Sequence, residues 1–337
     1  MSDAISAYEL TKTYGNGVRA LSGLSFSVTQ GTIFALIGPN GAGKSTAVKI
    51  LTTLARPDSG TAIVAGYDVR RQPEQVRRRI GAVAQQNISD PYATGRENLR
   101  FHGHIHGLRR KRLQQRIDML IERFELTSAA DRMVYEYSGG MRRRLDIAMG
   151  FIHEPTVLFL DEPTTGLDPS IRARMWREIT QMCSESRVTV LLTSHYLEEV
   201  ERVADRLAII HRGRIAAEGT PGSLKSRLGG GDVVVVELDH PVTEGNIAAL
   251  LRRVAAIQEV QPDGSSIRLR AADGGTVIPG ILDSLREQGL GVLSVTMSTP
   301  TLDDVYLLSD ASGATIQSGG PGLSLLHDPV SAAYSHR

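Results

Sequence analysis

The sequence is poor in cysteine and in long apolar runs, and each shortage excludes a class of protein. Its 337 residues include a single cysteine, Cys183, so no disulfide can form within the chain. Such usage is typical of a reducing compartment. No apolar run approaches the roughly 20 residues that span a bilayer, and Asp3 and Glu9 lie where a signal peptide would carry basic residues. We therefore expect a soluble, cytoplasmic chain.

An excess of one charge is also lacking. The 38 basic and 37 acidic residues leave a net charge of +1, which argues against a protein that binds nucleic acid through a global basic field. Arginine supplies most of the positive charge, since only five of the basic residues are lysines. The basic clusters at 77–79, 109–112 and 142–144 are interpreted as solvated helix faces or edges.

Three apolar runs predict buried parallel strands. They are GTIFALIG (31–38), TVLFLDEP (156–163) and VTVLLTSH (188–195), and each ends in polar residues. Ligand sites of α/β proteins lie at the carboxyl ends of such strands. An α/β core with a mostly parallel sheet is therefore predicted over residues 1–228.

The periodicity changes along the rest of the chain. Between Gln86 and about Thr156 the pattern is helical, which predicts a helical insertion over about 86–156. The stretch LGGGD (228–232) is typical of a linker. Beyond it we predict a small α+β domain over 232–309, followed by a tail, 310–337, that we expect to be flexible. Its predicted strands are 232–239, 265–273 and 292–298, and its predicted helices are 244–257 and 277–289.

A phosphate-binding loop is predicted at GPNGAGKST (38–46), which matches G-x-x-x-x-G-K-[ST] between a predicted strand and a helical pattern. The glycines let backbone N–H groups surround phosphate oxygens at a helix N-terminus. Lys44 would reach the β- and γ-phosphates, and the Ser45 hydroxyl would ligate Mg²⁺. The residues expected to bind the nucleotide are Gly38, Pro39, Asn40, Gly41, Ala42, Gly43, Lys44, Ser45 and Thr46.

An acidic pair follows the second apolar run. Asp161, at a strand end beside the phosphate loop, would hold Mg²⁺, and Glu162 could orient and deprotonate an attacking water. An acidic pair after a strand is often only a solvated turn, but the phosphate loop favours the catalytic interpretation. No asparagine precedes a lysine, so a guanine-reading Asn-Lys-x-Asp is absent and ATP is the expected nucleotide.

With GPNGAGKST, YSGGM (137–141) and VLFLDEPTTGLDP (157–169) in this order, the chain resembles the ATP-binding subunit of ABC transporters over roughly Ile5 to Leu228. The family's signature motif is usually LSGGQ, and here Tyr replaces Leu and Met replaces Gln. Ser138, Gly139 and Gly140 are kept. The resemblance implies that two ATP-binding subunits meet head to tail, so that Ser138 and the N–H of Gly140 contact ATP on the partner's phosphate loop.

Four further residues take their expected roles from this resemblance. Tyr14 would stack on adenine, Asp168 would lie at the dimer seam, and His195 would hydrogen-bond the γ-phosphate. Gln85 would sense Mg²⁺ and the attacking water, although Gln86 adjoins it and the choice between them is open. Otherwise Tyr14 would be a surface tyrosine of a strand, and His195 would be a capping or packing residue.

A narrower resemblance, to the ABC ATPases of daunorubicin and doxorubicin resistance, is carried by ATGRENLRFHGHIHGL (93–108), YSGGMRRRLDIA (137–148) and PTLDDVYL (300–307). It implies a peripheral subunit at the cytoplasmic face of the membrane. This subunit would use ATP and Mg²⁺ to power a separate permease that exports drugs or other hydrophobic compounds. LDDVYL could equally be an amphipathic helix that seals the C-terminal domain.

Other functions remain open at this point. An importer subunit would carry the same cassette. A soluble ABC ATPase that remodels ribosomes or DNA usually has two cassettes or a long coiled coil, and neither pattern is present. A regulatory module without turnover is disfavoured by the presence of both Glu162 and His195. The sequence leaves homodimer and heterodimer equally open.

Overall fold

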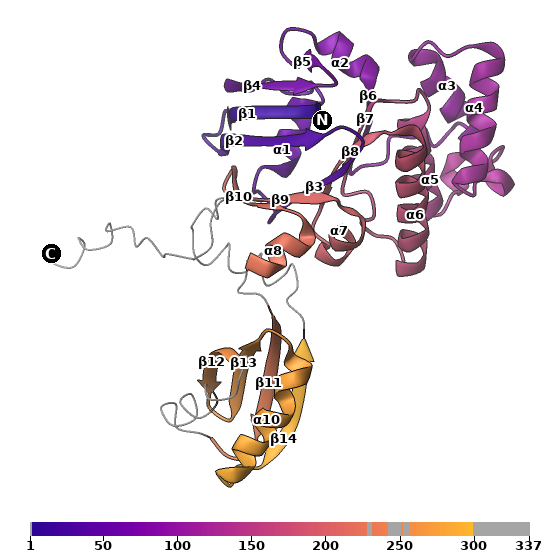
Figure 1. Ribbon diagram of the computed structural model, residues 1–337. Coiled ribbons are helices and arrows are strands. Elements are labelled where there is room, and N and C mark those ends of the chain that lie inside the picture. The colour runs from indigo at the N-terminus through magenta and orange to yellow at the C-terminus, as the bar shows by residue number, and fades with distance from the viewer. Residues whose placement is uncertain (1, 228–230, 242–250, 252–256, 299–337) are drawn as a thin grey trace.

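A six-stranded sheet forms the centre of the larger part of the molecule. The computed structural model, which describes residues 2–227, 231–241, 251 and 257–298, orders its strands β10-β9-β3-β8-β7-β6 (Figure 1). Five neighbouring strands are parallel, and β10 joins β9 antiparallel at one edge. Their bounds are β3 Ile33–Ile37, β6 Ile80–Val83, β7 Val157–Asp161, β8 Thr189–Ser194, β9 Arg206–His211 and β10 Arg214–Gly219. The three predicted strands correspond to β3, β7 and β8, so the α/β, mostly parallel core is confirmed.

The register of these strands brings distant parts of the chain to one edge. Ile37, the last residue of β3, pairs with Ser194 at the end of β8, and Asp161 of β7 pairs with Thr193. The phosphate loop, the acidic pair and His195 follow these three strand ends. Parallel pairing alone therefore gathers residues that lie more than a hundred positions apart.

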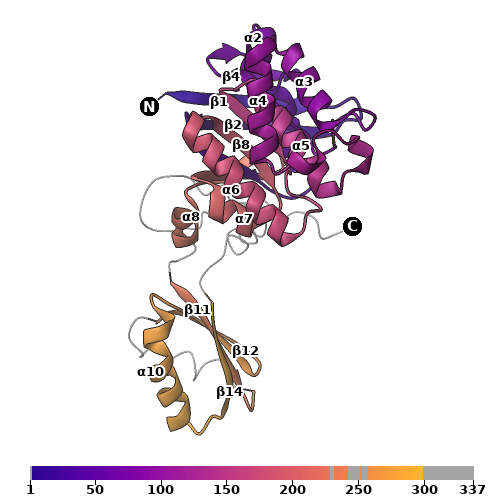
Figure 2. The ribbon, with the colours of Figure 1, turned by 90° about the vertical axis from the view of Figure 1, so that its right-hand side faces the viewer.

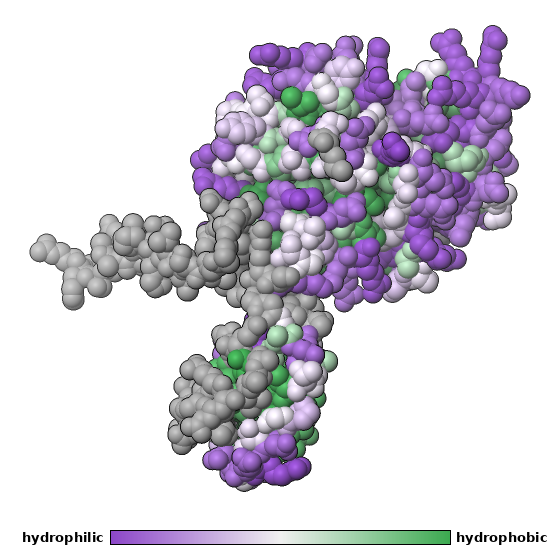
Figure 3. All heavy atoms as spheres, viewed as in Figure 1, coloured by the Kyte–Doolittle hydropathy of each residue, from purple (hydrophilic) through white to green (hydrophobic). Residues whose placement is uncertain are grey.

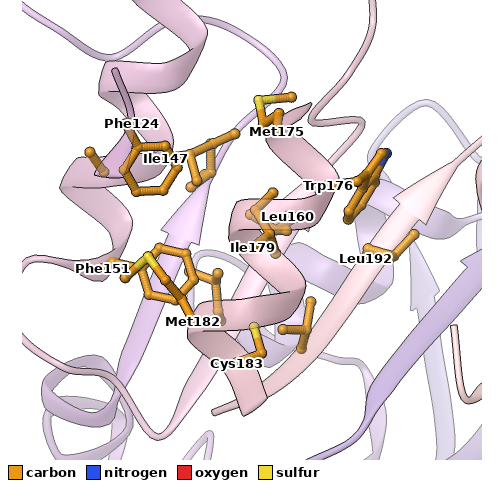
Figure 4. Close-up of a cluster of buried hydrophobic side chains, with 14 of the residues drawn as sticks. Phe124, Ile147, Phe151, Leu160, Met175, Trp176, Ile179, Met182, Cys183 and Leu192 are labelled. Carbon is orange, nitrogen blue, oxygen red and sulfur yellow. The ribbon is translucent and has the colours of Figure 1, made fainter. Parts of the chain in front are cut away.

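Both faces of the sheet are buried, which explains why its strands are continuously apolar. Along β3, Ile33, Ala35 and Ile37 join a core under the helices, whereas Phe34 and Leu36 join a second core on the opposite face. The helix-side core includes the aromatic and sulfur side chains of Figure 4. In the second core Phe26 and Phe34 stack with ring centroids 5.5 Å apart.

A second, antiparallel sheet covers that opposite face and was not predicted. Its order is β2-β1-β4-β5, with β1 Asp3–Thr13, β2 Arg19–Thr29, β4 Ser59–Val64 and β5 Tyr67–Asp68. The helices α1 (Lys44–Leu51) and α2 (Pro73–Arg79) accompany it. Its strands alternate buried and exposed residues less regularly than a simple hairpin because β1 contains register shifts.

The helical insertion predicted after Gln86 is confirmed. It consists of α3 (Gly95–Ile105), α4 (Arg110–Arg123) and α5 (Gly139–Phe151), with short 3-10 turns at Thr127–Ala129 and Val134–Glu136. Figure 2 shows the three helices grouped together beside the sheet. A capping box at Thr94 and Glu97 fixes the start of α3. Three further helices follow, α6 (Pro169–Ser186), α7 (Leu197–Val203) and α8 (Pro221–Arg227).

The C-terminal part forms a separate α+β unit. Its four strands pair antiparallel in the order β12-β13-β11-β14, with β11 Asp232–Leu238, β12 Ile257–Asp263, β13 Ser266–Ala271 and β14 Val292–Ser298. The helix α10 (Gly274–Glu287) begins three residues earlier than predicted because Asp273 caps it. The strand β12 was missed, since it contains Pro262 and several polar residues.

Several predictions for this region cannot be compared with the structure. Apart from Leu251 and Ile257, the predicted helix 244–257 lies outside the described residues, as do 300–307 and the tail 310–337. The domain boundaries at 228 and 232 stay predictions. Among the residues that are described, no helix is long and apolar enough to cross a membrane.

The arginine clusters divide into two kinds. Residues 77–79 and 109–112 are exposed, as predicted, and the surface over α3 and α4 is hydrophilic in Figure 3. The prediction was wrong for 142–144. Arg143 is only 5% exposed, and Arg142 and Arg144 are half-buried, with guanidinium groups that donate to backbone carbonyls.

Candidate functional site

The phosphate loop is shaped by Gly38 and Gly43, where a side chain would collide with backbone. Gly43 precedes α1 with a φ of 114°, a conformation that strongly favours glycine. A Cβ on Gly38 would lie 2.3 Å from the carbonyl oxygen of Ile210, and one on Gly43 would lie 2.5 Å from that of Ala20. The loop is therefore pressed against β9 and β2, and its backbone is directed toward the open side.

Lys44 is held inside this loop. Its side chain is 6% exposed, and Nζ donates to the carbonyl oxygens of Gly38, at 2.7 Å, and Pro39, at 3.1 Å. Burial lowers the pKa of Lys44, and the nearby carboxylates of Glu162 and Asp161 act in the opposite direction. The loop's own carbonyl groups thus hold the Lys44 ammonium group inside the loop.

A cavity of about 850 Å³ opens above the loop. It is lined by the phosphate loop and by side chains from the ends of the neighbouring strands, so its floor carries the positive end of α1 and its wall carries carboxylate, amide and imidazole groups. Among its lining residues are Tyr14, Gly38, Pro39, Asn40, Gly41, Gly43, Lys44, Ser45, Thr46, Gln85, Glu162, Thr165 and His195. This volume suits a nucleotide-sized ligand.

The acidic pair is fixed by Thr193 on the adjacent strand. The Thr193 hydroxyl donates to Asp161 Oδ1 at 2.5 Å, and the backbone N–H of Glu162 donates to Thr193 at 3.1 Å to Oγ1 and 3.2 Å to the carbonyl. Glu162 has a φ of 47°, a left-handed conformation that is uncommon outside glycine and that concentrates at functional sites. This kink turns its side chain into the cavity.

The Glu162 carboxylate lies beside two other predicted site residues, Gln85 and His195, and beside Thr165. Gln85 Nε2 donates to Oε2 at 3.1 Å, the Thr165 hydroxyl lies 3.3 Å from the same oxygen, and His195 Nδ1 lies 3.4 Å from Oε1. Of the two adjacent glutamines, Gln85 lines the cavity, whereas Gln86 does not. Glutamine, glutamate and histidine thus converge at one point, from three separate strand ends.

Tyr14 lies at the rim of the cavity. Its ring is 38% exposed, and its hydroxyl lies 3.3 Å from Thr46 Oγ1. Lys12 Nζ lies 5.9 Å from the ring centroid. A partly exposed ring beside the phosphate loop presents a face on which a nucleobase can stack.

The signature residues do not reach this cavity. Ser138 and Gly139 are exposed, and Gly140 is buried against Ile171. Ser138 caps α5, since its hydroxyl oxygen accepts from the N–H of Met141 at 3.2 Å. A Cβ on Gly139 would have no described neighbour within 4 Å. Asp168, which precedes α6, is also exposed and also absent from the cavity lining.

Arg143 is the residue that sequence reasoning missed. Its guanidinium donates to the carbonyl oxygens of Ala84, Asp161, Glu162 and Pro163, at 2.5 to 3.1 Å. Burial lowers the pKa of Arg143, while Asp146 and Asp161 favour its charged form. A signal was available, because Gly140, Arg143 and Ile147 share one helical stripe, and both neighbours are small or apolar.

A second polar network lies behind the site. Glu199 of α7 is 8% exposed and accepts hydrogen bonds from the Thr164 hydroxyl at 2.6 Å and from the indole of Trp176 at 2.7 Å. Arg172 Nη1 lies 2.8 Å from its other oxygen and stacks its guanidinium on Tyr196. The segments that carry Glu162 and His195 are thereby joined to α6.

The residues predicted to hold Mg²⁺ fit that ion. Ser45 and Gln85 line the cavity, whereas Asp161, at the end of β7, is not part of the lining. The Asp161 carboxylate favours the charged form of Lys44. Within the described residues, no group of three or more His, Cys, Asp or Glu side chains could hold a metal. Mg²⁺ bound to nucleotides normally takes only one or two protein carboxylates and fills its octahedron with phosphate and water. A hydroxyl, a carboxylate and an amide oxygen therefore suffice here.

Comparisons with known proteins give matches over most of the chain. Residues 21–165 match the family described as ABC transporter, and residues 219–308 match the C-terminal domain of DrrA1-3-like ATP-binding proteins. The chain is 42% identical to the daunorubicin resistance ATP-binding protein DrrA2 of Streptomyces coeruleorubidus, over 90% of this chain and 94% of that one. It is 33% identical to the linearmycin resistance ATP-binding protein LnrL of Bacillus subtilis, over 93% and 99%.

Solved structures give the same fold. An ATP-binding subunit of an ABC transporter superposes with a TM-score of 0.61 at 29% identity, covering 67% of this chain and 93% of that one. The protein cbiO1 of Clostridium perfringens, part of the ABC transporter complex cbiONQ, superposes with a TM-score of 0.63 at 26% identity, covering 68% and 92%.

Proposed function

Because the chain belongs to the family of ABC transporter ATP-binding proteins, we propose that it hydrolyses ATP to energise an exporter of drugs, antibiotics or other hydrophobic compounds. Relatives that match at least 90% of the chain are named for resistance to daunorubicin, doxorubicin and linearmycin. Export is the transport direction that gives resistance to a toxic compound.

Each residue at the cavity has a role in this proposal. Lys44 and the loop N–H groups bind the phosphates, and Tyr14 stacks on adenine. Ser45, Asp161 and Gln85 offer oxygen ligands for Mg²⁺, which neutralises phosphate charge when bound. Glu162 orients and deprotonates the attacking water, and His195 donates a hydrogen bond to the γ-phosphate.

The main support for a dimer is that Ser138 does not line the cavity of its own subunit. The helix α5 begins with the exposed Ser138 and Gly139, and a Cβ on Gly139 would meet no described atom within 4 Å. Such a helix N-terminus is suited to an anion. A second subunit, placed head to tail, brings its own bound ATP to this N-terminus. We propose such a dimer, as a homodimer or with a related subunit, with Asp168 at the seam.

The partner that moves the substrate is a separate integral-membrane permease, and the subunit binds its cytoplasmic face. ATP must bind the closed dimer more tightly than the open one to drive a conformational change in that permease. Hydrolysis replaces one bridging γ-phosphate contact by separated products and reopens the dimer.

The proposal is tested by expressing the chain with a candidate integral-membrane permease and measuring ATP-dependent accumulation of daunorubicin in inside-out membrane vesicles. Lys44→Ala should abolish accumulation. Lys49→Ala is the matched control, because Lys49 is an exposed lysine of the same helix, and should leave accumulation unchanged.

Two results would contradict the exporter. Transport that runs only out of the inside-out vesicles, toward the side that is cytoplasmic in the cell, would indicate an importer. Hydrolysis that proceeds normally without any binding to the permease would indicate a soluble ABC ATPase.

A further inference from the structure

The helix that begins at the signature serine also holds the catalytic loop of its own subunit. Arg143 lies five residues after Ser138, about one and a half helical turns into α5. Its buried guanidinium has no carboxylate at hydrogen-bond distance among the residues that the structure describes, and it donates to four backbone carbonyls from two separate segments.

These carbonyls belong to the backbone that positions the side chains of Gln85 and Glu162. One is Ala84, directly before Gln85, and the others are Asp161, Glu162 and Pro163, which form the kinked end of β7. The Glu162 backbone is therefore fixed on both sides, by Thr193 at its N–H and by Arg143 at its carbonyl. Such bracing explains how a glutamate is kept at a φ of 47°.

The same helix also holds the other end of the glutamine loop. Asp146, fully buried one turn after Arg143, accepts from the backbone N–H groups of Ser89 at 3.1 Å and Ile88 at 3.4 Å. Arg143 and Asp146 thus grip the segment that contains Gln85 before and after the glutamine. A shift of α5 must shift Gln85 and the end of β7 with it.

We propose that Arg143 is a positioning residue for Glu162 and Gln85 of its own subunit, and that α5 thereby connects the two ATP sites of the dimer. The inference rests on the proposed shared site. Ser138 at the start of α5 contacts ATP on the partner, whereas Arg143 of the same helix sets the carboxylate and amide that act on the subunit's own ATP. When Ser138 binds ATP of the partner subunit, α5 then sets the position of Glu162 at the ATP site of its own subunit.

Steady-state hydrolysis by the purified full-length chain gives the first test. Arg143→Met should lower kcat about a hundredfold, the loss expected from a misplacement of roughly 1 Å, and leave the KM for ATP within about twofold. Arg143→Lys, which keeps some of the donors, should be intermediate. Arg144→Met is the matched control. It removes a neighbouring arginine that contacts Phe124 and Glu125 instead, and it should keep kcat.

Mixed dimers assign the effect to one subunit. A subunit with Lys44→Ala is mixed with one carrying Ser138→Arg, so that a single intact site combines the phosphate loop of the second with the signature of the first. Arg143→Met added to the second, phosphate-loop subunit should remove the activity of that site. The same change in the first, signature-donating subunit should leave it.

The outcomes separate the two proposals. A loss that occurs only when the signature-donating subunit carries Arg143→Met, an equal loss in both placements, or no loss in either, would overturn the role of Arg143. Failure of the parent mixture to show activity would instead contradict the shared site. In that case the kcat and KM of the unmixed Arg143→Met and Arg143→Lys proteins still decide the positioning role. If Arg143→Met does not fold, Arg143→Lys decides it in both assays.

Discussion

The helices α1 and α5 both begin beside glycines, but their N-termini differ in what surrounds them. The N-terminus of α1 is enclosed: its glycines press against backbone, Lys44 is buried, and side chains from several strands line a cavity above it. The N-terminus of α5 is bare, with Ser138 and Gly139 exposed. One N-terminus forms the floor of a cavity and the other is exposed, which is the arrangement expected if the proposed site is divided between two subunits.

The largest loss of ATP turnover is expected from a substitution at the cavity above α1. Glu162→Gln should lower ATP turnover by about 10²–10⁴-fold, because it removes a general base, while ATP remains bound and holds the dimer closed. Turnover by malachite-green phosphate assay and dimer content by size-exclusion chromatography measure the two effects. Glu198→Gln, an exposed glutamate of α7, is the control. Near wild-type turnover for Glu162→Gln would remove Glu162 from the role of base.

At the exposed N-terminus of α5, Ser138 caps the helix and is proposed to bind the partner's γ-phosphate. A substitution can separate these two roles. Ser138→Asp keeps a good helix cap but sets a negative charge against the partner's γ-phosphate. The melting temperature should stay near that of the wild type, while ATP-induced dimerisation, measured by light scattering in the Glu162→Gln background, should weaken more than a hundredfold, as expected from a like-charge contact of several kcal/mol. If dimerisation is unchanged, Ser138 is only a cap.

Substitutions of Gly38 and Gly139 compare how tightly the two helix N-termini are packed. Gly38→Ala places a methyl 2.3 Å from the Ile210 carbonyl oxygen and should cost about 3 kcal/mol in the free energy of unfolding, as overpacking against backbone does. Gly139→Ala meets no described atom within 4 Å and should leave stability within about 0.5 kcal/mol, the usual range for a surface substitution. Urea denaturation gives both values. Equal costs would contradict the contrast.

A smaller effect concerns the joint between the helical insertion and β6. His153 stacks on His106 with centroids 3.6 Å apart, and its Nε2 lies 2.9 Å from the Ile80 carbonyl oxygen. Burial, followed by the neighbouring charges of His106, His102 and Arg116, lowers the pKa of His153 to about 4. The folded state favours neutral His153. Its contribution to the free energy of unfolding is therefore present above pH 6.5 and is lost as the pH falls toward 4.

The wild type should therefore lose roughly 1–2 kcal/mol more than His153→Gln between pH 7 and pH 5. Urea titrations of both proteins at the two pH values provide the measurement. Among the described residues, His106 and His153 are the one stacked histidine pair, and both belong to the helical insertion, so acid should loosen that region first. Parallel pH profiles for the two proteins would exclude His153 as the cause.

Much of the site could be predicted from sequence because its residues follow apolar strands. Lys44, Glu162 and His195 each come after a continuous buried strand, and parallel pairing carries such ends to one edge whatever the distance along the chain. Gln85 could not be separated from Gln86 by sequence, because the choice depends on which side chain reaches Glu162. That contact joins residues 77 positions apart.

Other features depend on contacts that no local pattern reveals. Three consecutive arginines predict solvent exposure, but Arg143 is buried because carbonyls near positions 84 and 162 provide its acceptors. The strand β12 was missed because Pro262 and polar residues weaken its alternation, although proline is tolerated on an edge strand such as this. The antiparallel sheet of β1, β2, β4 and β5 lacked a distinctive signal of its own.

The division of the ATP site between subunits is tested most directly by mixing full-length Lys44→Ala with full-length Ser138→Arg and measuring occluded, radiolabelled ATP. Each protein alone should occlude none, because every site in it lacks one half. The mixture should recover occlusion, with one intact site per mixed dimer. A mixture that occludes no more ATP than either protein alone would contradict the sharing of α1 and α5 between subunits.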